Sequence, residues 1–203
     1  ANGTLTLDDA LTGVASVGAT GSATSGAITL LADGDVTVNA SLETGTADTV
    51  DGDATSGLVS VTSSNGSVAM SAATVMTGDA TVTGNGTATS GAITLTAERN
   101  VDSDALSTGV ASAAEGDATS GAIDVVATSG NVTLTTVTSG DATVAGNGTA
   151  TSGAITLTAS GANGTLTLDD ALTGVASVGA TGSATSGAIT LLADGDVTVN
   201  ASL

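Results

Sequence analysis

The stretch Ser-Gly-Ala-Ile-Thr-Leu-Thr-Ala at residues 152–159 decides the fold. Ile155 and Leu157 alternate with Thr156 and Thr158, and a period of two is typical of a β-strand with one apolar face. The chain has no proline, which would remove a hydrogen bond from a sheet. Apolar residues make up 40% of the chain, more than a disordered polar chain carries. The sequence therefore predicts an ordered all-β protein.

The Thr-Ser-Gly motif at the start of this stretch recurs along the whole chain. Its serines are spaced by 31, 34, 30, 32 and 34 residues, so each repeat is about 32 residues long. These five steps span 161 residues, and residues 1–42 recur without a change as residues 162–203 at that same offset. The larger period is therefore a 161-residue unit built of five small repeats. The serines are Ser25, Ser56, Ser90, Ser120, Ser152 and Ser186.

Each small repeat holds three short strand-like runs, separated by glycine, Asn-Gly and Asp-Gly turns. The first run follows Thr-Ser-Gly, the second resembles 36–38, and the third resembles 80–82 and is placed at 14–16 in the first repeat. One repeat cannot bury its apolar face alone, but stacked copies can, because backbone hydrogen bonds then join neighbouring coils. We therefore expect one continuous domain over residues 1–203, a parallel β-helix (β-solenoid) with about 32 residues and three strands per coil.

The first run supplies the predicted core. Its two apolar positions share one face of the strand. When the repeats stack, the first position forms a column of isoleucine and valine, and the second forms a column of leucine and valine. The predicted core stack is Ile28, Leu30, Val59, Val61, Ile93, Leu95, Ile123, Val125, Ile155, Leu157, Ile189 and Leu191.

Charge gives a test of this stacking. The second residue of the motif Gly-X-Ala-Thr-Ser-Gly is, in chain order, Ser22, Asp53, Thr87, Asp117, Thr149 and Ser183. Stacked coils would place these side chains about 5 Å apart, where like charges repel each other. No two aspartates follow each other in the series, as the stack predicts.

The composition excludes several classes of function. Twenty acidic residues face one base, Arg99, and the resulting net charge of -19 excludes binding to a phosphate backbone. The chain has no histidine, cysteine, lysine or aromatic residue, so it offers no thiol or imidazole catalyst, no zinc site and no stacking platform. No apolar run has the length of a membrane span. We expect no enzyme activity, no catalytic residue and no cofactor.

Paired aspartates are the remaining candidates for a metal site. Asp33, Asp35, Asp51 and Asp53 lie in turns, and turn carboxylates can bind calcium. They lack the spacing of calcium-binding β-rolls and of twelve-residue calcium loops. Solvated turn residues are the alternative interpretation.

Eight of the nine asparagines lie in Asn-x-Ser/Thr sequons, which suggests a glycosylated surface protein. The alternative is that Asn-Gly turns simply adjoin threonine-rich strands. The candidate acceptors are Asn2, Asn39, Asn65, Asn85, Asn131, Asn147, Asn163 and Asn200.

Two further features have a functional and a plain interpretation. Thr-x-Thr pairs on the first strand suggest an ice-binding face, but Asp124 and Val126 break the ladder, and outward threonine suits any polar strand face. Arg99 is the only base, and a surface ion pair with Glu98 or Asp102 is its expected role.

The halves of the repeat, Ser-Gly-Ala-Ile-Thr-Leu-Thr-Ala at 152–159 and Gly-Asn-Val-Thr-Leu-Thr at 130–135, resemble the repeats of filamentous haemagglutinin-type adhesins and large autotransporter passengers. The resemblance implies a right-handed β-helix outside the cell or at its surface. The implied function is a structural segment of a very long fibre or adhesin that provides reach, stiffness and a repetitive surface.

Both ends of the chain lie in mid-repeat, so we expect it to be a window on a longer array. Its expected partner is itself, through end-to-end coil stacking or lateral packing, with no nucleic acid, no membrane span and no identified receptor or glycan. The alternatives are a self-assembling filament or sheath subunit and an ice-binding β-solenoid.

Overall fold

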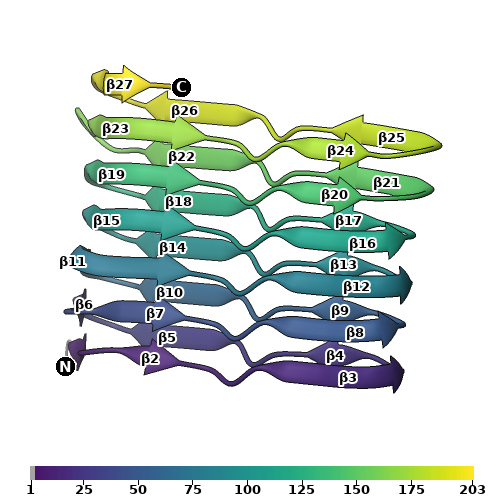
Figure 1. Cartoon of the computed structure of the whole chain (residues 1–203). Coiled ribbons are helices and arrows are strands. Elements are labelled where there is room, and N and C mark those ends of the chain that lie inside the picture. Colours follow the sequence, from purple (N-terminus) through teal and green to yellow (C-terminus); the bar gives the residue numbers. More distant parts are fainter. Residues whose placement is uncertain (1–2) are drawn as a thin grey trace.

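The strands pair in parallel along the whole axis of the molecule, and each coil lies on the one before it. The computed structural model describes residues 3–203, and Figure 1 shows the coils stacked from the N-terminal end to the C-terminal end. Ile28 pairs with Val59, Val59 with Ile93, and the series continues to Ile189, so the register follows the spacing of the Thr-Ser-Gly motif. The fold is a β-solenoid of about 6 turns.

Each coil contributes to four sheets, which we name A to D. Sheet A holds β1 (Leu5–Leu7), β2 (Ala10–Leu11), β6 (Val36–Val38), β7 (Ser41–Glu43), β11 (Val68–Met76), β15 (Val101–Ser107), β19 (Val132–Thr138), β23 (Leu166–Leu172) and β27 (Val197–Ser202). Sheet B holds β3 (Ala15–Thr20), β8 (Ala47–Asp51), β12 (Ala80–Asn85), β16 (Ala111–Glu115), β20 (Ala142–Val144) and β24 (Ala176–Val178). Sheet C holds β4 (Ala23–Thr24), β9 (Ala54–Thr55), β13 (Ala88–Thr89), β17 (Ala118–Thr119), β21 (Gly148–Thr151) and β25 (Gly182–Thr185). Sheet D holds β5 (Ile28–Ala32), β10 (Val59–Ser63), β14 (Ile93–Ala97), β18 (Ile123–Ala127), β22 (Ile155–Ala159) and β26 (Ile189–Ala193).

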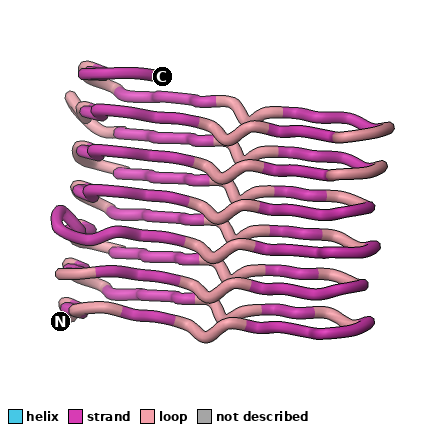
Figure 2. The backbone as a smooth tube through the Cα atoms, in the orientation of Figure 1, coloured by secondary structure: helices cyan, strands magenta, loops and turns pink. Residues whose placement is uncertain are grey.

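The chain runs through the sheets in the order A, B, C, D, so the coil has two layers. Sheets A and B form one layer, and sheets C and D form the other. Loop segments cross the middle of each layer and divide the molecule into two lobes, as Figure 2 shows. We call this middle region the waist.

Each lobe has its own core. The large lobe, between sheets A and D, is filled by isoleucine, leucine and valine, and by Met70. All twelve residues of the predicted core stack belong to it, with Leu30, Ile189 and Leu191 partly buried in the terminal coils. The small lobe, between sheets B and C, is filled mainly by alanine, so these sheets lie close together.

The structure corrects two details of the predicted coil. There are four strands per coil rather than three, because a short strand of sheet C, two to four residues long and ending in Ala-Thr, precedes each Ser-Gly. The third predicted run was placed one residue early in the first coil: Ala15, not Val14, pairs through Ala47 with Ala80. Val14 instead lies outside the core, 67% exposed.

The turns at both edges, and a bulge in β11 between Met70 and Thr74, absorb the differences in coil length. The turn between sheets B and C contains a column of glycines, of which Gly52 (φ 115°) and Gly116 (φ 106°) adopt a backbone conformation that favours glycine. The longest turn between sheets D and A, after β22, contains Asn163 at φ 71°. Outside a few bulges, strand register is therefore conserved from coil to coil although coil length is not.

The 161-residue unit repeats in structure as well as in sequence. Leu5 pairs with Val36 at one end of the molecule, and the identical residues Leu166 and Val197 pair in the same register at the other end. Strand β27 therefore pairs with the sixth coil in the same way as β6 of the second coil pairs with the first.

Candidate functional site

The four calcium candidates lie at opposite edges of the coil. Asp33 and Asp35 lie in the turn between β5 and β6, where sheet D meets sheet A. Asp51 ends β8 and Asp53 precedes β9, where sheet B meets sheet C. The two pairs are therefore separate, one in the turn at each edge of the coil.

The carboxylates of these pairs bind the next coil. Asp35 Oδ1 accepts a hydrogen bond from the Ser67 amide (2.8 Å), and Asp33 Oδ1 accepts one from the Asn65 side-chain amide. At the other edge, Asp51 and Asp53 accept bonds from the backbone amides of Asn85 (2.9 Å) and Thr87 (3.1 Å). Within residues 3–203 no group of three or more acidic residues could hold a metal ion. Calcium binding stays a prediction.

Acidic and neutral residues alternate along these edges. Asn85 stands between Asp51 and Glu115, and the Asn147 amide donates to Glu115 Oε2 (2.8 Å). In the motif series the Asp117 Oδ1 atom accepts a bond from the Thr149 amide (2.9 Å). Asp51, Glu115 and Asp117 thus each receive a hydrogen-bond donor from the next coil instead of another negative charge, which limits repulsion in a chain of net charge -19.

The sequon asparagines are exposed wherever the structure describes them. Asn39, Asn65, Asn85, Asn131, Asn147, Asn163 and Asn200 are all exposed, and Asn2 lies outside the described residues. Several of these side-chain amides donate to an acid of the preceding coil: Asn39 bonds Asp8 (3.0 Å), and Asn200 bonds Asp169 (2.7 Å). A sugar would replace one hydrogen of such an amide and leave the other free to donate. Glycosylation stays a prediction.

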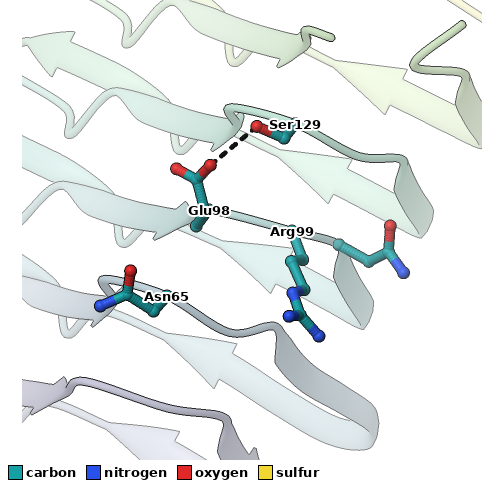
Figure 3. A pocket seen from close by; sticks show the side chains of 5 residues that line it. Asn65, Glu98, Arg99 and Ser129 are labelled. Atoms are coloured by element: carbon teal, nitrogen blue, oxygen red, sulfur yellow. Dashed lines mark hydrogen bonds between the residues drawn. The ribbon is translucent and has the colours of Figure 1, made fainter. Parts of the chain in front are cut away.

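Arg99 lies at an open polar hollow, shown in Figure 3. Its lining residues are Asn65, Glu98, Arg99, Asn100 and Ser129. The Glu98 carboxylate accepts a hydrogen bond from Ser129 Oγ (2.8 Å), and the Arg99 side chain extends away from it. Glu98 bonds the next coil and is not directed toward Arg99, and an ion pair of Arg99 with Asp102 stays a prediction. The hollow offers hydrogen-bonding groups and one guanidinium.

The waist contains buried hydroxyls that sequence analysis did not identify as structural. Ser90 Oγ donates across the waist to the Gly109 carbonyl (2.6 Å) and accepts a bond from the Gly121 amide of the next coil (2.8 Å). From the opposite layer, Thr108 Oγ1 donates to the Gly121 carbonyl (2.8 Å). Each hydroxyl thereby joins its own coil to the next coil and to the other layer.

This arrangement repeats along the axis as two columns. In both columns each hydroxyl residue, serine or threonine, is followed by a glycine. The glycine is required because the backbones of neighbouring coils lie close together: a Cβ on Gly121, for example, would overlap the backbone oxygen of Gly91. The waist hydroxyls that donate across the waist are Thr12, Ser25, Thr44, Thr77, Ser90, Thr108, Ser120 and Ser139. Ser56 and Ser152 accept a bond from the glycine amide of the next coil.

The threonine ladder of the first strand lies on the outer face of sheet D. Thr29, Ser60, Thr94, Asp124 and Thr156 stack in that order. Leu31, Thr62, Thr96, Val126 and Thr158 form the parallel column. Asp124 and Val126 therefore interrupt both columns in the same coil.

Comparison with protein-family models, with curated proteins and with solved structures finds no match for this chain. The described residues contain no helix long and apolar enough to cross a membrane. The function must therefore be argued from the geometry of the solenoid itself.

Proposed function

We propose that this chain is a structural segment of a very long extracellular fibre or surface adhesin. Its role is mechanical: it sets the distance between two points and presents a repetitive surface. Catalysis has no part in this role, because the open hollow at Arg99 and the hydrogen-bonded turn acids provide no constellation of nucleophile, acid and base.

The observation that carries this proposal is the repetition of register over 161 residues. Leu5–Val36 and Leu166–Val197 are the same pair in the same geometry, so units can be added without altering any contact. At about 4.8 Å per coil, one unit of five coils extends the molecule by about 24 Å. Length therefore grows in proportion to the number of units.

Two further features suit such a spacer. Backbone ladders and waist hydroxyls join each coil to its neighbours, which resists bending and local unfolding. The surface is rich in threonine, serine and acids and carries a net charge of -19, which favours solubility and disfavours nonspecific binding. A receptor-binding function would belong to another part of such a fibre.

The test is to display one, two and four copies of the 161-residue unit on a cell surface, each with the same fluorescent tag at the outer end. The proposal predicts that the distance from membrane to tag rises linearly, by about 24 Å per unit. A flexible linker of equal residue number is the control, and its reach should grow only with the square root of length. A solenoid array whose reach follows the control would refute the proposal.

A further inference from the structure

Acidic residues are distributed unevenly between the two layers of the solenoid. Of the twenty acids in the chain, Asp124 alone lies in a strand of sheet C or D. The other nineteen lie in sheets A and B, in the segments next to their strands, or in the turns at the edges. Asp53 and Asp117 mark the rim, directly before strands of sheet C. One broad face of a strongly acidic molecule is therefore almost uncharged.

We define the C/D face as the outward residues of sheets C and D and of the waist between them. It consists of four stacked columns that are mostly threonine, with alanine, four larger apolar residues and one acid. The columns are Thr24, Thr55, Thr89, Thr119, Thr151 and Thr185; Ala27, Leu58, Ala92, Ala122, Ala154 and Ala188; Thr29, Ser60, Thr94, Asp124, Thr156 and Thr190; and Leu31, Thr62, Thr96, Val126, Thr158 and Leu192.

The C/D face leaves apolar side chains in water. Leu58, in an interior coil, is 45% exposed, and Leu31 and Leu192 are exposed in the first and last coils, where a neighbouring strand covers one side only. The opposite layer exposes more large apolar residues, but acids lie beside most of those whose neighbours are given. Val110 lies between Asp79 and Asp141, and Leu11 and Met76 both pair with Glu43. Leu172, which pairs with Thr138, is an exception. Large apolar side chains without interleaved charge are typical of a surface that becomes covered.

We propose that the C/D face is a lateral docking surface for a second copy of this chain. Two molecules of charge -19 repel each other in every orientation that brings sheets A and B or the turn edges together. Only contact between two C/D faces removes apolar surface from water and keeps nearly all carboxylates outside the interface. The low charge of the C/D face therefore favours a second C/D face as its partner. The two faces would pack as aligned sheets.

The available area is sufficient for such a pair. The face is about seven residues wide and six coils long, or about 23 Å by 29 Å. Pairing would bury roughly 1,300 Å² in total, which lies within the size range of specific protein interfaces. This inference does not rest on the proposed fibre function, because a single solenoid would give the same reach.

The experiment measures mass per unit length of the 203-residue chain by scanning transmission electron microscopy and by small-angle scattering of the cross-section. Lateral pairing doubles this quantity, whereas end-to-end stacking of coils leaves it unchanged. We expect twice the value of one solenoid for the unaltered chain. A value of one solenoid at the highest soluble concentration would overturn the proposal.

Matched variants locate the interface. Thr62→Asp with Thr158→Asp places two acids on sheet D, and Thr37→Asp with Thr143→Asp places two acids on sheets A and B. None of these four positions pairs with an acid in a neighbouring coil. Only the sheet D pair should halve the mass per unit length. Equal effects of the two pairs would overturn the proposal. Circular dichroism confirms that each variant is folded.

A variant that should strengthen pairing, because it removes a charge from the face, completes the test. Asp124→Thr removes the one charge in these strands and should lower the concentration for half-maximal pairing roughly tenfold. Unchanged or weaker pairing would count against the C/D face as the interface. Thermal hysteresis by a chain that remains single would assign the face to ice and overturn pairing with a second copy.

Discussion

At the scale of single residues, the interior of this solenoid depends on whether each buried hydroxyl has a partner. The waist hydroxyls donate and accept hydrogen bonds, and they lie in fixed Ser-Gly or Thr-Gly pairs. Ser103 points into the large lobe of the core, between Met70 and Leu134 in its column, and its Oγ has no partner in the part of the chain that the structure describes. Ser103, whose hydroxyl has no partner, and Ser90, whose hydroxyl has two, should therefore affect stability in opposite directions.

Replacing Ser103 by alanine should stabilise the fold. Ser103→Ala removes a buried hydroxyl that has lost its water, and the free energy of unfolding should rise by about 1 kcal/mol. Denaturant unfolding measures the change. Ser112→Ala, on the outward face of sheet B, is the control and should change stability by less than about 0.5 kcal/mol. A less stable Ser103→Ala protein would show that the hydroxyl is satisfied.

Replacing Ser90 by alanine should have the opposite effect. Ser90→Ala leaves the Gly109 carbonyl and the Gly121 amide without their partner at the waist. We expect a loss of about 2–3 kcal/mol in the free energy of unfolding, measured against the same Ser112→Ala control. If Ser90→Ala and Ser112→Ala were equally stable, water would replace the Ser90 hydroxyl, and that hydroxyl would not be what joins the two layers.

At the scale of strands and sheets, sequence periodicity predicts the large lobe well and the small lobe poorly. Strands β14 and β22 of sheet D alternate apolar and polar residues over five positions, so their register and inward face follow directly. A two-residue strand of sheet C has no alternation to detect. In sheet B the narrow space admits alanine, so Ala15 faces the core and the larger Val14 faces solvent.

The candidate site shows a similar division. Alternation of acids along the motif series could be predicted from spacing, because it depends only on which residues stack. The waist hydroxyls could not be predicted from hydrophobic pattern, since serine and threonine also dominate the outer faces. The signal that would have found them is the glycine that follows each one, which permits close approach of two backbones.

Stacked like charge should weaken the coil-to-coil contact. Thr87→Asp would place an acid between Asp53 and Asp117 in the motif series, making three neighbouring carboxylates. We expect the free energy of unfolding to fall by about 1 kcal/mol at low ionic strength and to recover with added salt. Ser183→Asp, whose paired neighbour is Thr149, is the control. Salt-independent destabilisation would point to a steric effect instead.

At the scale of the whole molecule, stability and shape both come from repetition. Each coil satisfies its backbone groups on its neighbours, and both lobes continue through all six coils without a break. Residues 1–42 and 162–203 are identical, and they pair with their neighbours in the same register at an offset of 161 residues. A long array should therefore be a straight, uniform rod rather than a chain of separate domains.

The axial repeat of a tandem array of the 161-residue unit tests this account most directly. Fibre diffraction or electron microscopy should show a layer spacing of about 4.8 Å and a superperiod of about 24 Å per unit. A beaded particle with a spacing of about 40 Å or more, typical of tandem globular domains, would contradict the solenoid and every stacking argument that depends on it.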